Sequence, residues 1–207
     1  MFIRWLLVDP HLFVTMLFLV TFSICCHEFM HALIALKMGD DTAARSGHLT
    51  LNPLKQMGLL SLVMLLLLGI AWGQVPVNRA NFRSRAGRVA TILAGPLANL
   101  ALWMVFLALR LITGMCTDNR FAMAMLQYGA MINFLLFVFN LLPVPGLDGF
   151  NIMIELFPRI FHRDSEVAKG AYLLLIALLF IHYELIFGLA MMVTEQTLTL
   201  LQRMAGV

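Results

Sequence analysis

Long apolar runs separated by short polar connections dominate the chain. No Asp, Glu, Lys or Arg occurs within residues 10–27, 56–78, 89–109 and 121–147, and another apolar region begins at Ala171. Each run is close to the roughly 20 residues that a helix needs to cross a bilayer. The pattern predicts an all-α polytopic membrane protein, built as a bundle of about four to five spanning helices.

Composition agrees with this fold class. The chain is 61% hydrophobic and 12% charged, and its mean hydropathy is +0.90. A water-soluble domain could not cover its surface with so few charges. We therefore expect a single membrane-embedded domain over residues 1–207, surrounded by the lipid bilayer. The formal net charge of +3 gives no reason to expect a nucleic-acid partner.

One apolar run contains two imidazoles and an acid, in the string His27-Glu28-Phe29-Met30-His31. Residues four apart share a helix face, so His27 and His31 can bind one metal ion, and Glu28 lies beside that face as a candidate general base. HExxH arises by chance in roughly one chain of a few hundred. Chance, however, does not explain three polar groups in a membrane segment, where ionisable side chains are costly. The pattern predicts a metal hydrolase.

A third ligand is needed, because catalytic zinc normally takes three protein ligands and a water. The metzincin continuation would place Gly and His where Ile34 and Lys37 stand, which excludes that class. The carboxylates and imidazoles that stay open as candidates are His48, Asp148, Glu155, His162, His182 and Glu184.

Asp148 follows the apolar run 121–142 in the string NLLPVPGLDG. Its Pro, Gly and Asp residues also fit an ordinary turn. Irregular backbone at membrane depth is tolerated only where it lines a cavity or is buried in protein. The surroundings of Asp148 are therefore compatible with a site but do not by themselves establish one.

Three motifs together resemble the site-2 protease family of intramembrane zinc metalloproteases, peptidase family M50. They are HEFMH, GPLAN at 95–99 and NLLPVPGLDG at 140–149, and the resemblance extends over about 23–152. GHLTLNPL and VPVNRANFR are also similar to the compact bacterial branch of that family. Phe150 and Arg79 stand where the family often has Gly and Pro.

The resemblance implies a site and a reaction. It implies that His27, His31 and Asp148 bind one Zn²⁺ per chain, that Glu28 is the catalytic base, and that Asn140 assists by binding the scissile peptide or its oxyanion. The enzyme would hydrolyse peptide bonds in or near transmembrane segments of single-span or membrane-anchored substrate proteins. Glu28 would activate a zinc-bound water as the nucleophile.

The sequence also suggests how a substrate could bind. The alternating HLTL pattern predicts a short β-strand region near 46–52, which could pair with an unwound substrate segment.

The alternative function is an intramembrane zinc transporter, because buried His and Glu also mark ion pathways. A transporter would need successive polar sites or repeated halves, and the sequence has one cluster and no repeat. A non-catalytic scaffold would not need Glu28.

The expected spans are 11–37, 89–113, 121–142 and 171–194, where the last region could form either one span or two short helices broken at 182–184. His27 and His31 lie late in the first span and Asp148 follows the third, so both helices must run in the same direction for the three residues to meet. The apolar segment 58–74 is then expected to be re-entrant or interfacial.

Ten of the 14 Lys and Arg residues fall on the side that holds 37–88 and 143–170, which predicts that side to be cytoplasmic. We expect a bacterial inner-membrane protein whose active site faces the cytoplasm.

Small or polar residues recur every four positions before and within the second span, at Gly87, Thr91, Gly95 and Asn99. Such a stripe lets another helix approach closely, and Asn99 can hydrogen-bond across the interface. Two interpretations stay open: ordinary helix packing, or support of the helix that carries HExxH.

Overall fold

The computed structural model describes residues 2–158, 170, 173–174, 177 and 182–206. The chain divides into two compact units, Met1–Asn99 and Leu100–Val207. The boundary falls inside helix α6 (Arg85–Cys116), so each unit contains a part of this helix. The two units are taken in turn.

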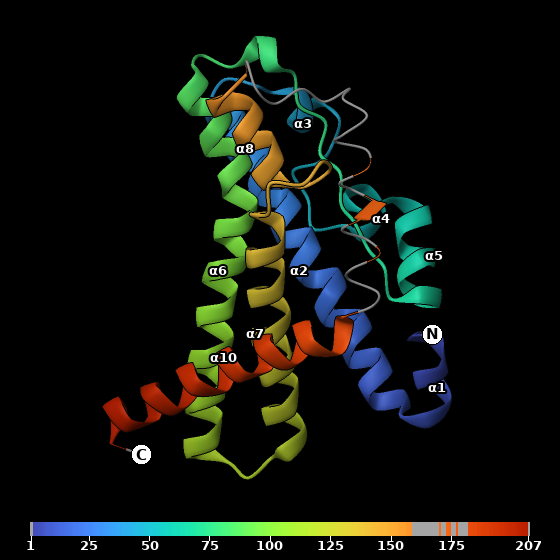
Figure 1. Ribbon diagram of the computed structural model, residues 1–207, viewed down its shortest axis with the longest axis vertical. Coiled ribbons are helices and arrows are strands. Elements are labelled where there is room, and N and C mark those ends of the chain that lie inside the picture. Colours follow the sequence, from blue (N-terminus) through green and yellow to red (C-terminus); the bar gives the residue numbers. More distant parts are fainter. Residues whose placement is uncertain (1, 159–169, 171–172, 175–176, 178–181, 207) are drawn as a thin grey trace. The chain divides into compact units, whose positions relative to one another are not determined.

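Helix α2 (Pro10–Lys37) is the longest element that lies wholly in the first unit (Figure 1). Its start is fixed by Asp9, whose carboxylate accepts a hydrogen bond of 2.9 Å from the Leu12 N–H, and by Pro10 in the first turn. The short elements η1 (Phe2–Arg4) and α1 (Trp5–Val8) precede it. At about 1.5 Å per residue, α2 is about 42 Å long, which is enough to cross a bilayer.

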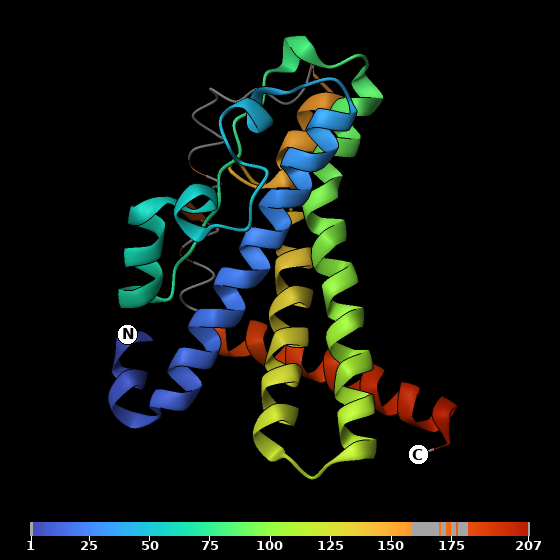
Figure 2. The ribbon, with the colours of Figure 1, turned by 180° about the vertical axis from the view of Figure 1, so that it is seen from behind.

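The rest of the first unit is made of short elements between α2 and α6. They are α3 (Thr42–Arg45), α4 (Pro53–Gln56), α5 (Gly58–Leu68) and η2 (Arg79–Asn81). Helices α3 and α4 pack on α2, and α4 packs on α5 (Figure 2). Because α5 is about 16 Å long, it is too short to cross the roughly 30 Å hydrocarbon core. Its re-entrant or interfacial placement stays a prediction.

The short β-strand expected near residues 46–52 does not form; within the described part of the chain no residue lies in a strand. Gly47 has a positive φ of 77°, which turns the backbone at the start of this stretch. The side-chain amide of Gln56 then donates to the carbonyl oxygens of His48, at 2.9 Å, and Thr50, at 2.6 Å. This buried amide takes the two carbonyls that a neighbouring strand would have used.

The second unit is also helical, with α7 (Arg120–Asn140), α8 (Asp148–Leu156) and α10 (Tyr183–Ala205). Asn119 caps α7 by accepting from the Ala122 N–H at 3.1 Å. Helix α10 packs on α7. A small core joins α6, α7 and α10 through the buried side chains of Leu107, Ala130 and Leu198.

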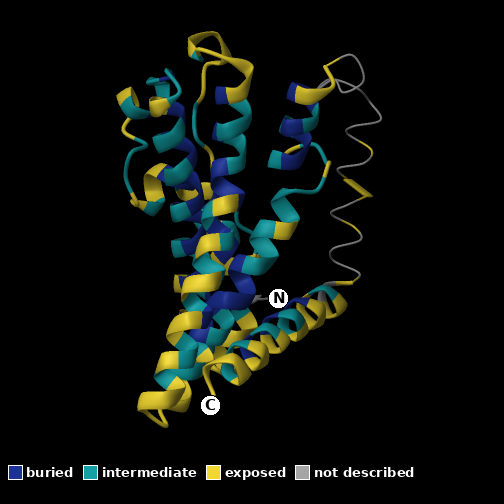
Figure 3. Cartoon of the chain, turned by 90° about the vertical axis from the view of Figure 1, so that its left-hand side faces the viewer, coloured by how far each residue is buried: buried dark blue, intermediate teal, exposed yellow. Residues whose placement is uncertain are grey.

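Four described helices are long and apolar enough to cross a membrane: Pro10–Lys37, Arg85–Cys116, Arg120–Asn140 and Glu184–Ala205. Figure 3 shows that much of their surface is exposed in the isolated chain. On α10, for example, Leu185, Leu189 and Leu200 are exposed apolar side chains. The chain is therefore an all-α polytopic membrane protein. The expected span 171–194 lies partly outside the described residues, and the described helix there continues to Ala205.

Candidate functional site

The first half of the site is a buried imidazole pair on α2. His27 and His31 are 6% and 8% exposed. Their Nε2 atoms lie 2.9 Å apart, and the two rings meet edge to face with centroids 4.6 Å apart. Glu28, which is 8% exposed, follows His27 directly. The structure thus brings together the two imidazoles and the acid, as the HExxH spacing predicts.

The other ring nitrogens are held by α6. His27 Nδ1 lies 2.5 Å from Asn99 Oδ1, and His31 Nδ1 lies 2.7 Å from the Thr91 carbonyl oxygen. Both oxygens can only accept, so both Nδ1 atoms must donate. The Asn99 amide nitrogen points to the Ser23 carbonyl oxygen, 3.5 Å away, which is consistent with the assignment of Oδ1 to the His27 side.

This hydrogen bonding determines the tautomers of the neutral rings. With hydrogen on each Nδ1, each Nε2 carries a lone pair, and the two lone pairs face the same space across 2.9 Å. Two facing lone pairs repel one another unless a cation lies between or beside them. Metal-binding histidines use this arrangement, with the second ring nitrogen donating to a carbonyl or amide oxygen. The donor set therefore fits a metal ion.

A glycine keeps the space in front of the two Nε2 atoms open. A Cβ atom added to Gly95 would overlap both Nε2 atoms and would lie 2.6 Å from His27 Cε1. Gly87, two turns earlier on α6, faces Met38, with its added Cβ 3.1 Å from the Met38 Cβ. The four-residue stripe on α6 therefore packs against α2 and also supports the HExxH residues, so both interpretations of the stripe apply.

Backbone also covers Glu28. A Cβ atom added to Gly73 would overlap Glu28 Cγ and Oε1 and would lie 2.5 Å from Cδ. Gly73 belongs to residues 70–78, an irregular segment between α5 and η2. The sequence analysis included Gly73 in the apolar segment 58–74, expected to be re-entrant or interfacial. It predicted neither the contact with Glu28 nor the hydrogen bonds of residues 70–78, because these bonds involve mainly backbone groups.

Asp148 and Asn140 belong to the second unit. Asp148 is the first residue of α8 and is partly buried; an acidic side chain is favourable in a first turn. Asn140 ends α7, and its amide nitrogen donates to the Leu136 carbonyl oxygen at 2.9 Å.

Gly149 packs tightly on the backbone that follows α7. A Cβ atom added to it would lie 2.5 Å from the Leu142 carbonyl oxygen, so a side chain would not fit there. Phe150, where the family often has Gly, is buried against Ile154.

The other candidate ligands have different surroundings. His48 Nδ1 lies 3.0 Å from the Ser46 hydroxyl oxygen. His182 and Glu184 are exposed at the start of α10, and Glu155 is buried in α8. His162 lies outside the described residues.

A buried imidazole pair with an adjacent acid, on a helix long enough to cross a bilayer, defines a metallopeptidase of the membrane-spanning class. The sequence model of peptidase family M50 matches residues 109–182. A relative named "Putative zinc metalloprotease YwhC", from Bacillus subtilis, is 38% identical over 157 residues, which cover 72% of this chain and 70% of the relative. The chain belongs to peptidase family M50, the site-2 protease family.

Two further relatives carry the name "Putative zinc metalloprotease Rip2". The protein from Mycobacterium tuberculosis is 38% identical over 136 residues, or 62% of this chain and 51% of the relative. The one from Mycolicibacterium smegmatis is 32% identical over 167 residues, or 76% of this chain and 63% of the relative. The chain thus spans about half to two thirds of the length of these two proteins. No solved structure gives a significant match.

Proposed function

We propose that the protein is an intramembrane zinc endopeptidase that cleaves peptide bonds in or near the transmembrane segments of other membrane proteins. The observation that supports this best is the buried His27–His31 pair, with both Nδ1 atoms donating and Glu28 alongside. A purely structural histidine pair would not require an adjacent buried acid.

In this proposal His27 and His31 bind one zinc ion through Nε2, and Asp148 supplies the third ligand through its carboxylate. The three residues offer two nitrogen donors and one oxygen donor, and the histidines are buried while Asp148 is partly buried. This donor type and number are usual for catalytic zinc. When bound, the ion would polarise the peptide carbonyl and make water more acidic.

Glu28 acts as the general base. Its carboxylate accepts a proton from the attacking water and later returns that proton to the leaving amine. Burial excludes bulk water from the Glu28 side chain, so the transferred proton stays within the site. Asn140 assists by donating to the scissile peptide or its oxyanion, because its amide nitrogen carries two hydrogens and the bond to Leu136 uses one.

The substrates are single-span or membrane-anchored proteins. A transmembrane helix satisfies its carbonyl groups internally, so the substrate must unwind locally before attack. We place the enzyme in a bacterial inner membrane with the site towards the cytoplasm. Support comes from the ten of 14 Lys and Arg residues in the connections 37–88 and 143–170.

Glu28→Gln tests the proposal. The amide is nearly isosteric but accepts no proton, so cleavage of a single-span substrate in liposomes should fall by about 10²-fold or more while bound zinc is retained. The matched control is Glu195→Gln, which changes an exposed acid on α10 and should cleave at the wild-type rate. Wild-type cleavage by Glu28→Gln would contradict the mechanism. Zinc transport that continues in this variant would favour a transporter.

A further inference from the structure

Residues 70–78, which we name the Gly73 strap, lie against the proposed catalytic base. At its closest approach the strap presents the backbone of Gly73 to Glu28, where an added Cβ would overlap Cγ and Oε1. Any side chain at position 73 would therefore force the Glu28 side chain to shift. Glycine at this position lets main chain pack directly on the carboxylate-bearing side chain.

The strap is tied to the protein on both sides of Gly73. Ser61 makes two hydrogen bonds to one residue: its hydroxyl donates to the Trp72 carbonyl oxygen at 2.6 Å and accepts from the Trp72 N–H at 2.9 Å. On the other side, the Gln74 N–H donates to the Gln56 carbonyl oxygen at 2.9 Å. Ser61 and Gln56 are both 0% exposed, so water does not compete for these bonds.

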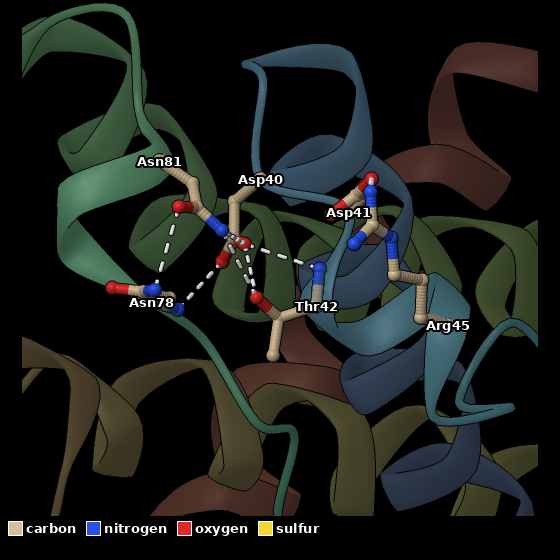
Figure 4. Close-up of polar contacts among 6 residues, drawn as sticks. All are labelled: Asp40, Asp41, Thr42, Arg45, Asn78 and Asn81. Atoms are coloured by element: carbon tan, nitrogen blue, oxygen red, sulfur yellow. Dashed lines mark hydrogen bonds and ion pairs between the residues drawn. The ribbon is translucent and has the colours of Figure 1, made fainter.

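A third tie holds the far end of the strap. The Asn78 N–H donates to the Asp40 carboxylate at 2.7 Å. The same carboxylate accepts from the Thr42 hydroxyl at 2.5 Å and from the Asn81 amide at 3.0 Å, as Figure 4 shows. The strap is therefore fixed to α5, to α4 and to the turn that follows α2.

We infer that Ser61 is a positioning residue for proteolysis: by fixing both backbone groups of Trp72, it holds Gly73 against Glu28 and so restricts the orientation of the carboxylate. This inference rests on the proposed role of Glu28 as general base. A glutamate side chain has three rotatable bonds, and proton transfer requires an approach of about 2.6–3.2 Å. A misplacement of about 1 Å can lower a rate by about 10²-fold.

The first test replaces Ser61 with Ala. The expected result is a kcat at least tenfold below wild type, with KM and bound zinc unchanged and faster hydrogen–deuterium exchange of a peptide that covers residues 70–78. The control Thr199→Ala removes an exposed hydroxyl that bonds to the Glu195 carbonyl oxygen within α10, and it should change none of these quantities. A wild-type kcat in Ser61→Ala, together with faster exchange in the strap, would overturn the inference.

A double-mutant cycle tests the contact itself and stands alone if Ser61→Ala does not fold. Gly73→Ala should lower kcat when residue 28 is Glu. It should also lower the free energy of unfolding much less in the Glu28→Ala background than in the wild type, because alanine has neither the Cγ nor the carboxylate that the added methyl group overlaps. The control Gly188→Ala has no atom within 4 Å of its added Cβ and should act equally in both backgrounds. Equal losses from Gly73→Ala in both backgrounds would overturn the inference.

The two proposals fail in different ways. If wild-type protein with bound zinc cleaves no membrane substrate, the proposed function is wrong. If the wild type cleaves but the Ser61 and Gly73 variants behave as their controls, only the positioning role is wrong.

Discussion

His27 Nδ1 and Asn99 Oδ1, 72 positions apart in the sequence, lie 2.5 Å from one another and join α2 to α6. Because Asn99 accepts, His27 must carry its hydrogen on Nδ1 and direct Nε2 to the metal space. A single amide on a neighbouring helix thus determines which nitrogen of His27 can act as a ligand.

Asn99→Ala should weaken zinc binding by about 10- to 100-fold, the usual cost of losing the partner of a metal-binding histidine. Without the acceptor, the tautomer with hydrogen on Nε2 becomes populated, and this form cannot bind the metal through Nε2. Competition with a chromogenic chelator measures the affinity. Asn119→Ala removes the exposed cap of α7 and should keep wild-type affinity; an unchanged affinity in Asn99→Ala would refute the prediction.

Gly95→Ala should abolish zinc binding while the helices remain folded. The added methyl group would occupy the space next to both Nε2 atoms, where it overlaps them. Elemental analysis of purified protein measures zinc, and circular dichroism reports helix content. Gly188→Ala makes the same chemical change at an open position and should bind zinc as the wild type does.

Asp148→Ala and His31→Ala should each lose the zinc, because removal of one of three protein ligands leaves an incomplete site. His48→Ala and His182→Ala should keep it, since neither residue belongs to the proposed ligand set. Elemental analysis also settles this comparison. Full zinc content in Asp148→Ala would remove that residue from the ligand set.

Asp40 should make stability depend on pH. Burial alone would raise the pKa of Asp40, but the hydrogen bonds from Thr42, Asn78 and Asn81 outweigh burial and lower this pKa below its ordinary value. A lowered pKa in the folded state stabilises the fold at pH values above the unfolded pKa of about 3.9, and this stabilisation is lost as pH falls through the folded pKa.

Asp40→Asn should therefore lower the free energy of unfolding at pH 7 by about 1–3 kcal/mol, because the amide cannot accept all of these bonds. The difference from wild type should shrink below about pH 4. Chemical denaturation in detergent at both pH values measures it. Asp41→Asn, which loses only the exposed pair with Arg45, should cost about 0–1 kcal/mol. A difference that grows in acid would contradict the assignment.

Single cysteines should report the sidedness of the membrane. In a background in which Cys25, Cys26 and Cys116 are replaced, a cysteine at Arg83 should react with an impermeant thiol reagent from the cytoplasmic side. A cysteine at Asp118 should react from the opposite side. The reverse labelling would contradict the orientation expected from the positive charges.

The sequence alone predicted those features that follow from the regular spacing of residues along a helix. HExxH has helical spacing, so the shared face of His27 and His31 follows from geometry, and the stripe from Gly87 to Asn99 predicted a close helix contact that the structure confirms. The strand near 46–52 was wrong because alternation is only a local signal. The side chain of Gln56, several residues away, takes the carbonyls of His48 and Thr50, and no periodicity records such a bond.

The bonds of the Gly73 strap could not be predicted for a related reason. Ser61 and Trp72 pair through a hydroxyl and a backbone, and nearly every serine in a sequence could make such a pair. The importance of this pair depends on the contact between Gly73 and Glu28, which is known only from the folded structure.

The stripe on α6 also has a consequence for insertions and deletions. At 3.6 residues per turn, deletion of one residue between Gly87 and Asn99 would rotate the positions beyond it by about 100°, so that they would face away from α2. Substitutions in this stripe can change one contact at a time, whereas a change of length breaks several at once. The exposed connection between α6 and α7, at residues 117–119, has no such limit and should accept added residues. In this helix the spacing of the stripe residues is therefore constrained as well as their identity.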